Sequence, residues 1–244
     1  MAILPFGVRH LFGLTSQYRE LLALSDQVER TVASVRQKLP KEAVDELAIP
    51  SYTHPNPLMR HLFWERLAVA LEWLDGLSPT PSVVLDFGCG IGLLFPSLER
   101  RGIRIIGCDI HPDATAAGVD SFGVSNVQIL DAREGFASLA DESVGAILAL
   151  DVLEHVHNVA SLAAEFQRLL PPQGRLLCSL PTENALYRIG RRLAGFSGAY
   201  HVHDPQDAVK KLGACLEVRR IGRLYSFAPL FDFFEARRLP ATSS

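Results

Sequence analysis

Four aspartates lie at or near the ends of four apolar runs in the middle of the chain. Asp109, Asp131 and Asp151 each end a run, and Asp86 is the next-to-last residue of its run; successive members lie 23, 22 and 20 positions apart. This interval is about the length of one strand, one helix and two short loops, so it predicts repeated β–α winding. Ligands of open α/β sheets bind beyond the carboxyl ends of the strands. We therefore expect four carboxylates at one sheet edge, where they suit a ligand with a cation and sugar hydroxyls.

A glycine-rich loop comes directly after the first aspartate. The apolar run 83–87 contains Asp86, and Gly88, Gly90 and Gly92 follow at alternate positions. Glycine permits tight turns and lets the backbone approach a ligand where a Cβ would collide. The apolar segment 93–98 then predicts a helix, whose N-terminus favours an anionic group. An NAD fingerprint has its third glycine one position later, so the spacing and Asp86 disfavour an NAD site.

The remaining strands and the turns between them predict the fold class. Two C-terminal segments, 216–227 and 230–239, are expected to pair as terminal strands, which places Phe231, Phe233 and Phe234 in a buried strand rather than a membrane anchor. We expect an α/β, Rossmann-like three-layer sandwich with a seven-stranded, mostly parallel sheet and an antiparallel terminal strand. The first five strands are predicted over residues 83–87, 104–109, 127–131, 146–151 and 174–180.

Helical periodicity precedes and follows the sheet. Apolar residues recur every three or four positions over 16–39, which predicts one amphipathic helix folded over the core as part of a lid, with a dimer seam or a membrane-facing helix as alternatives. Further helices are expected over 58–77, from Asp151 through Leu170, and over 206–212. We predict a helical N-terminal cap over residues 1–56 and a Rossmann-like domain over 57–244, with an acceptor-pocket insertion around 183–204.

Five motifs in order resemble those of class I S-adenosylmethionine-dependent methyltransferases, in particular small-molecule, type 11-like enzymes. The resemblance covers about residues 80–182 and implies S-adenosylmethionine as cofactor. The motifs are Val83 to Gly92, Gly107 to Ile110, Asp131-Ala132, Asp151 to Val156, and Leu169 to Leu176.

The resemblance also implies a role for each residue of these motifs. Gly88, Cys89, Gly90 and Gly92 would pass under the methionine end of the cofactor. Asp86 would lie near its amino group, and Asp109 would bind the ribose hydroxyls, with Ile110 following it in the same motif. Asp131 would bind the adenine amino group, with Ala132 against the ring, and Asp151 would lie near the methionyl portion.

A hydroxyl acceptor would require a general base, and a neutral histidine is well suited to that role near neutral pH. His155 is the first candidate, with Glu154 and His201 as further catalytic candidates; alternatively, Glu154 and His155 pair only to fix the local structure. A metal site is not expected, because the H-x-H pairs lack acids at ligand spacing. The candidate acceptor contacts are Tyr52, His54, Pro181, Asn184, Tyr187, Arg188 and His203.

The composition is that of a globular enzyme, with 244 residues, 48% hydrophobic residues and a net charge of −3. We expect methyl transfer to a small molecule, by O-methylation of a sugar, a lipid-linked intermediate or a natural-product precursor. The weak negative charge argues against nucleic acid as partner. No membrane span or signal peptide is predicted, although peripheral lipid contact stays open, and the scattered cysteines indicate a cytoplasmic protein, monomeric or homodimeric. A catalytically inactive cofactor-binding regulatory or assembly protein and an NAD-dependent oxidoreductase are the alternatives.

Overall fold

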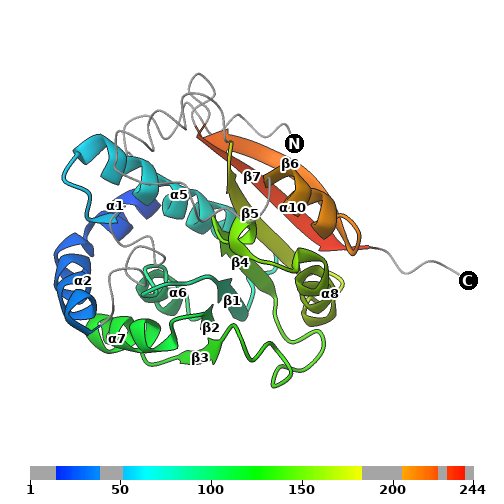
Figure 1. Ribbon diagram of the computed structural model, residues 1–244, viewed down its shortest axis with the longest axis horizontal. Coiled ribbons are helices and arrows are strands. Elements are labelled where there is room, and N and C mark those ends of the chain that lie inside the picture. The colour runs from blue at the N-terminus through cyan, green and yellow to red at the C-terminus, as the bar shows by residue number, and fades with distance from the viewer. Residues whose placement is uncertain (1–14, 39–51, 183–204, 225–229, 240–244) are drawn as a thin grey trace, which may run out of the picture. The chain divides into compact units, whose positions relative to one another are not determined.

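The computed structural model describes residues 15–38, 52–182, 205–224 and 230–239 (Figure 1). The chain divides into two compact units. The first unit is Arg9–Gly135, and the second unit is Phe136–Ser244 together with Met1–Val8. Within the part of the chain that the structure describes, no helical segment combines the length and the hydrophobicity that a membrane span requires.

The first unit contains a parallel sheet with strand order β3-β2-β1. Asp86 is in register with Gly107, and Asp109 is in register with Asp131, so two of the acids end neighbouring strands side by side. The elements are α1 (Ser16–Leu22), α2 (Ser25–Lys38), α5 (Pro57–Asp75), β1 (Val83–Phe87), α6 (Phe95–Arg100), β2 (Arg104–Asp109), α7 (Pro112–Phe122) and β3 (Val127–Asp131).

The second unit contains strands in the order β4-β5-β7-β6, in which β7 runs antiparallel to both of its neighbours. Phe231 and Phe233 are buried in β7, as predicted, while Phe234 is half-buried. The predicted fold class, a seven-stranded and mostly parallel sheet with an antiparallel terminal strand, is confirmed. The elements are β4 (Ala146–Leu150), η1 (Leu153–His155), α8 (Val159–Leu169), β5 (Arg175–Pro181), α10 (Pro205–Leu212), β6 (Leu216–Leu224) and β7 (Phe231–Arg238).

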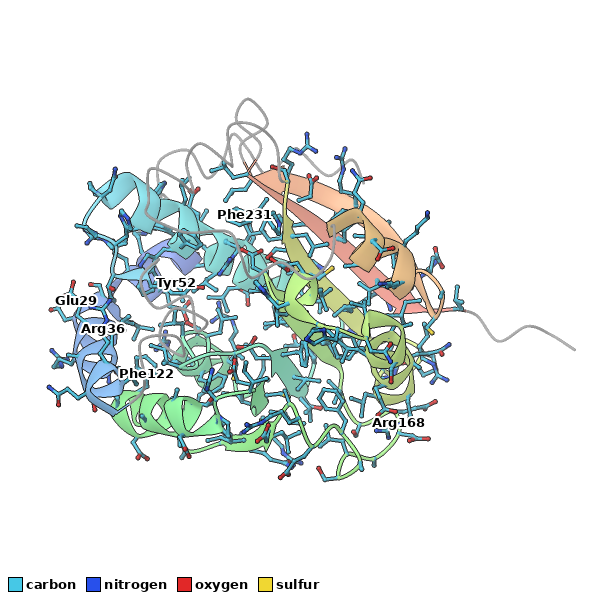
Figure 2. All side chains as sticks on the ribbon, in the orientation of Figure 1. Glu29, Arg36, Tyr52, Phe122, Arg168 and Phe231 are labelled. Atoms are coloured by element: carbon cyan, nitrogen blue, oxygen red, sulfur yellow. The ribbon has the colours of Figure 1, made fainter. Side chains whose placement is uncertain are left out.

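The N-terminal segment forms two helices, so the prediction of one helix over 16–39 is wrong. The chain turns at Ala23 and Leu24, whose N–H groups donate to the carbonyls of Arg19 and Leu21. The turn lets α1 pack on α5 while α2 packs on α7. The apolar stripe of α2 is therefore buried within the first unit, and the exposed Glu29 and Arg36 lie on its outer side (Figure 2).

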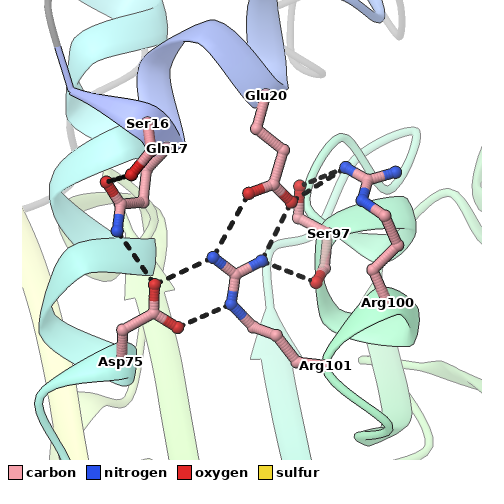
Figure 3. A network of polar contacts seen from close by, with 7 residues as sticks. All are labelled: Ser16, Gln17, Glu20, Asp75, Ser97, Arg100 and Arg101. Atoms are coloured by element: carbon pink, nitrogen blue, oxygen red, sulfur yellow. Dashed lines mark hydrogen bonds and ion pairs between the residues drawn. The ribbon is translucent and has the colours of Figure 1, made fainter.

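A polar network centred on Arg101 joins α1 and α5 to the end of α6 (Figure 3). The Arg101 guanidinium donates to Asp75 Oδ1 at 2.6 Å, to Glu20 Oε1 at 2.9 Å and to the Ser97 carbonyl at 2.8 Å. Gln17 of α1 donates to the other oxygen of Asp75 at 3.0 Å. The hydrogen bonds from Arg101 hold the pKa of Asp75 below its usual value. Charged groups thus fasten the first N-terminal helix to the Rossmann-like part of its unit.

The segment after β4 also differs from its prediction. The expected helix from Asp151 to Leu170 is a single turn, η1, followed by a separate helix that begins at Val159. The Asn158 side chain accepts a hydrogen bond from the Ser161 N–H at 3.1 Å and so caps α8. An asparagine cap satisfies an N–H that lacks a partner inside the helix, which favours a helix start at this residue. Glu154 and His155 therefore precede α8.

Candidate functional site

The loop after β1 has a backbone shape that requires glycine. Gly88, Gly90 and Gly92 have φ values of 75°, 55° and 75°, in the left-handed region that other residues seldom adopt. The Gly88 N–H donates to the Cys108 carbonyl of β2 at 2.8 Å. A Cβ on Gly92 would overlap the ring of Phe95. The loop is thus folded tightly over the end of β2, and its backbone is free of side chains at three positions.

Helix α7 supports this loop from one side. A Cβ on Gly118 would overlap the carbonyl oxygen of Ile91. The buried Thr115 donates from Oγ1 to the Gly90 carbonyl at 2.7 Å. Neither of these α7 residues was predicted from the sequence as part of the site. The sequence does contain a signal for them, a threonine and a glycine one helical turn apart in the helix after the second strand.

Asp109 is buried at the end of β2, and each of its carboxylate oxygens accepts a hydrogen bond from a backbone N–H. Its Oδ2 accepts from the Gly90 N–H at 2.8 Å, and its Oδ1 accepts from the His111 N–H at 2.9 Å. A carboxylate offers about four lone-pair positions. Asp109 can therefore orient the glycine loop and still accept hydrogen bonds from two hydroxyls of a ligand.

Asp86 lies inside β1 and is only 5% exposed. Burial raises the pKa of its carboxyl to about 7, with a further increase from the charge of Asp109 and a decrease from Arg66. A cationic ligand group near a carboxyl favours its charged form. The site thus offers a carboxyl that is close to its titration point near neutral pH and that a bound ammonium would ionise.

The edge beyond β2 and β3 combines an apolar side chain with charged groups. Ile110 is 45% exposed, one of three large apolar side chains left exposed among the described residues. Asp131 binds the Arg133 guanidinium, with Oδ2 to Nη2 at 2.6 Å, and these hydrogen bonds lower the pKa of Asp131 to about 2. The Ala132 N–H donates to the Asp109 carbonyl at 3.0 Å. Any ligand group on Asp131 would share that carboxylate with Arg133.

The candidates of the second unit lie after β4 and on β5. Asp151 has a φ of 51°, and its Oδ1 accepts from the Ser179 hydroxyl at 2.7 Å. The buried Glu154 and the exposed His155 occupy neighbouring positions of η1 but different environments. Pro181 is buried at the end of β5, in register with Phe231. Among these candidates, His155 is the exposed one.

A family model described as a methyltransferase domain matches residues 59–198, more than half of the chain. The chain belongs to this methyltransferase family. The resemblance to class I S-adenosylmethionine-dependent methyltransferases, and with it S-adenosylmethionine as the cofactor, is confirmed at the level of the family.

Curated relatives and solved structures agree with this assignment. The ubiquinone biosynthesis O-methyltransferase of Acinetobacter baumannii (strain AYE) is 33% identical over 122 residues, which cover 47% of this chain and 51% of that protein. The ribosomal protein L11 methyltransferase of Haemophilus ducreyi is 35% identical over 136 residues, 53% of this chain and 41% of that protein. The chain spans about half the length of the curated relatives it matches.

The fold is also that of a solved methyltransferase. The crystal structure of magnesium protoporphyrin IX methyltransferase from Synechocystis PCC 6803 with bound SAH aligns with a TM-score of 0.58 and 22% identity. The alignment covers 86% of this chain and 100% of that chain. At this level of identity the similarity establishes the fold.

In this methyltransferase, Tyr52 and His54, the two residues before α5 that were predicted to contact the methyl acceptor, form contacts with other residues of the fold. Tyr52 is buried, and its ring packs edge-on against Phe63 and Trp64. Its hydroxyl accepts a hydrogen bond from Arg66 at 2.5 Å. The His54 ring nitrogen Nδ1 accepts from the Asn56 N–H at 3.0 Å. The candidates Asn184, Tyr187, Arg188, His201 and His203, and the predicted insertion around 183–204, lie outside the described residues.

Proposed function

We propose that this methyltransferase transfers a methyl group from S-adenosylmethionine to a hydroxyl group of a small-molecule acceptor. The single observation that carries the proposal is the pairing of the glycine loop with Asp109, through the 2.8 Å hydrogen bond from Gly90. The bond keeps the loop close to a carboxylate that still has acceptor capacity. Family membership adds the reaction class.

The residues of the first unit fit the parts of this cofactor. Asp109 would accept hydrogen bonds from the ribose hydroxyls, and Asp86 would accept them from the amino group. Ile110, with its exposed apolar surface, would pack against the adenine ring. The glycine loop would pass along the methionine chain with no side chain in the way. The bound cofactor supplies a methyl group on a sulfonium, which is electrophilic.

We propose His155 as the general base that acts on the acceptor hydroxyl. His155 is exposed and follows β4, so its imidazole is accessible to take the proton of an acceptor hydroxyl. A small-molecule acceptor draws support from the ubiquinone biosynthesis O-methyltransferase among the relatives. A protein acceptor is the second candidate, because a ribosomal protein L11 methyltransferase is also among them. We further propose a cytoplasmic location and a helical cap over residues 1–56.

Product formation tests the proposal. The protein is incubated with S-adenosylmethionine and a panel of phenols, sugars, lipid-linked sugars and ribosomal protein, and S-adenosylhomocysteine and the methylated acceptor are measured by mass spectrometry. We expect turnover with a hydroxyl-bearing small molecule. His155→Gln should lower kcat about 100-fold or more, and His157→Gln, an exposed histidine two residues away, serves as the matched control. If the protein binds the cofactor but methylates no acceptor, a catalytically inactive cofactor-binding protein would be favoured. If it methylates ribosomal protein alone, the acceptor would be a protein and not a small molecule.

A further inference from the structure

The hydroxyl of Thr115 in α7 bonds outside its own helix. A threonine inside a helix commonly bonds the carbonyl three or four residues before it. Thr31 of α2 does this, because its Oγ1 donates to the Gln27 carbonyl at 2.8 Å. Thr115 instead donates to the Gly90 carbonyl of the glycine loop at 2.7 Å. Both threonines are buried, so the difference indicates that the Thr115 hydroxyl serves the loop and not its own helix.

The hydrogen bond from Thr115 holds one peptide group of the loop, the one that joins Gly90 to Ile91. Gly90 has a φ of 55°, and glycine can rotate where other residues are restricted. The Thr115 hydroxyl fixes the carbonyl of this peptide on the α7 side. The Cys89 thiol, 3.8 Å from the same carbonyl oxygen, is a weak donor. Thr115 is thus the side chain that sets the direction of this peptide.

Three further carbonyls of the loop lie against groups of the protein. The Cys89 carbonyl accepts from the Gly92 N–H at 2.9 Å, and the Gly92 carbonyl accepts from the Phe95 N–H at 3.0 Å. The Ile91 carbonyl lies so close to α7 that a Cβ on Gly118 would overlap its oxygen. Carbonyl oxygens carry partial negative charge. Because these oxygens are directed at the protein, an anionic group of a ligand beside the loop would not meet them.

The N–H of the fixed peptide belongs to Ile91. A trans peptide directs its C=O and its N–H in opposite directions. With the Gly90 carbonyl held toward α7, the Ile91 N–H therefore points away from that helix. A backbone N–H is a good donor to a carboxylate, because the hydrogen bond is strengthened by the negative charge.

We propose that Thr115 is a positioning residue for the cofactor, because it fixes the peptide that presents the Ile91 N–H to the carboxylate at the methionine end. The inference rests on the proposed function, which places the glycine loop along the methionine chain and assigns the amino group to Asp86. It gives the carboxylate, the other charged group of that end, a partner in the loop. Without the Thr115 hydroxyl, the peptide can flip and present the Gly90 carbonyl, which repels a carboxylate.

The test compares two ligands by calorimetry in the wild type and in Thr115→Val. S-Adenosylhomocysteine carries the carboxylate, whereas its decarboxylated analogue keeps the amino group and lacks the carboxylate. Valine has the shape of threonine without the hydroxyl. We expect affinity for S-adenosylhomocysteine to fall about tenfold, as for the loss of one charge-assisted hydrogen bond, and affinity for the analogue to change by less than about twofold. Thr115→Ser keeps the hydroxyl and should restore the wild-type ratio of the two affinities.

Thr31→Val is the matched control. It removes a buried threonine hydroxyl that bonds its own helix, so both affinities should stay at their wild-type values. The ratio of the two affinities corrects each variant for losses that are common to both ligands. If Thr115→Val does not fold, Thr115→Ala also removes the hydroxyl and is measured in the same way.

Three results would overturn the inference. The first is an unchanged affinity for S-adenosylhomocysteine in the folded variant without the hydroxyl. The second is an equal loss for the decarboxylated analogue, which would give Thr115 a structural role alone. The third is a failure of Thr115→Ser to restore the ratio of affinities. If the folded wild type binds neither ligand, the proposed function itself is overturned.

Discussion

The Oδ2 atom of Asp109 accepts a hydrogen bond from the Gly90 N–H at 2.8 Å, and this bond ties the last residue of β2 to the loop that follows β1. The other oxygen of the same carboxylate accepts from the His111 N–H at the start of α7. The buried Asp109 side chain therefore links the loop after β1 to the segment between β2 and α7. Asp109 has a structural role in addition to the cofactor role that we propose.

Asp109→Ala removes both carboxylate oxygens, so the backbone N–H groups of Gly90 and His111 lose their hydrogen-bond acceptor. We expect the free energy of unfolding to fall by about 1–3 kcal/mol, the usual cost of orphaned buried donors. Asp109→Asn keeps one acceptor oxygen and should lose less. Urea unfolding followed by circular dichroism measures both values. Wild-type stability in Asp109→Ala would show that the two hydrogen bonds do not hold the loop.

Gly118→Ala tests the close approach of α7 to the glycine loop. Alanine normally stabilises a helix interior by about 1 kcal/mol relative to glycine. Here the added Cβ would overlap the Ile91 carbonyl, so we expect a lower melting temperature and weaker cofactor binding instead. Asp120→Ala, at an exposed position of the same helix, controls for propensity. A stabilised Gly118→Ala protein with unchanged binding would contradict this packing.

Asp86→Asn should stabilise the ligand-free protein at high pH only. Below the ordinary pKa of 3.8, the Asp86 carboxyl is neutral in both the folded and the unfolded chain, and the substitution has no electrostatic effect. Between that value and about 7, the unfolded chain releases the proton while the folded chain keeps it, so wild-type stability falls as pH rises. Above pH 7 the loss is constant, and Asn should recover about 1–3 kcal/mol of it.

Thermal unfolding of wild type and Asp86→Asn at pH 4 and pH 8 measures this difference. The stabilised variant should also bind S-adenosylhomocysteine more weakly, because an amide is a poor partner for an ammonium. Such a trade between stability and function is common at binding sites. An equal effect of the substitution at both pH values would rule out the buried charge as its cause.

Arg101→Met tests the network that fastens α1. The depressed pKa of Asp75 means that its pairing with Arg101 stabilises the fold above the ordinary pKa of this carboxyl and is lost as pH falls through the folded value. Since Asp75 is partly exposed and screened by solvent, we expect a loss of about 1 kcal/mol at pH 7 and a smaller loss at pH 3. Arg100→Met, whose side chain is 50% exposed, should change stability by less. Equal losses in the two variants would show that the network adds nothing beyond surface charge.

The strands and the glycine loop were predictable because their pattern is local. A buried parallel strand is a continuous apolar run, and an acid at its end followed by glycines leaves a mark that does not depend on the rest of the fold. The break between α1 and α2 was not predictable in this way. Leu21 and Val28 keep helical spacing across the turn, and tertiary packing on two different helices decides where the chain bends.

The residues around the site were harder to predict than the site itself. Arg66 and Thr115 lie in the interiors of helices, where a polar residue is usually taken for part of a solvated face. Only the structure shows that both side chains are buried. The pairing of Asp131 with Arg133 depends on side-chain direction, which sequence spacing does not determine.

We propose that the first unit binds S-adenosylmethionine through Asp109 and the glycine loop. The most direct measurement is calorimetric titration of S-adenosylhomocysteine, and separately of NAD, into wild type and Asp109→Ala, with the fold of each checked by circular dichroism. We predict that the wild type binds S-adenosylhomocysteine and not NAD, and that a folded Asp109→Ala binds it at least about 100-fold more weakly, from the loss of charge-assisted hydrogen bonds to two hydroxyls. Binding of NAD alone, or equal S-adenosylhomocysteine affinity in the two proteins, would contradict this cofactor site.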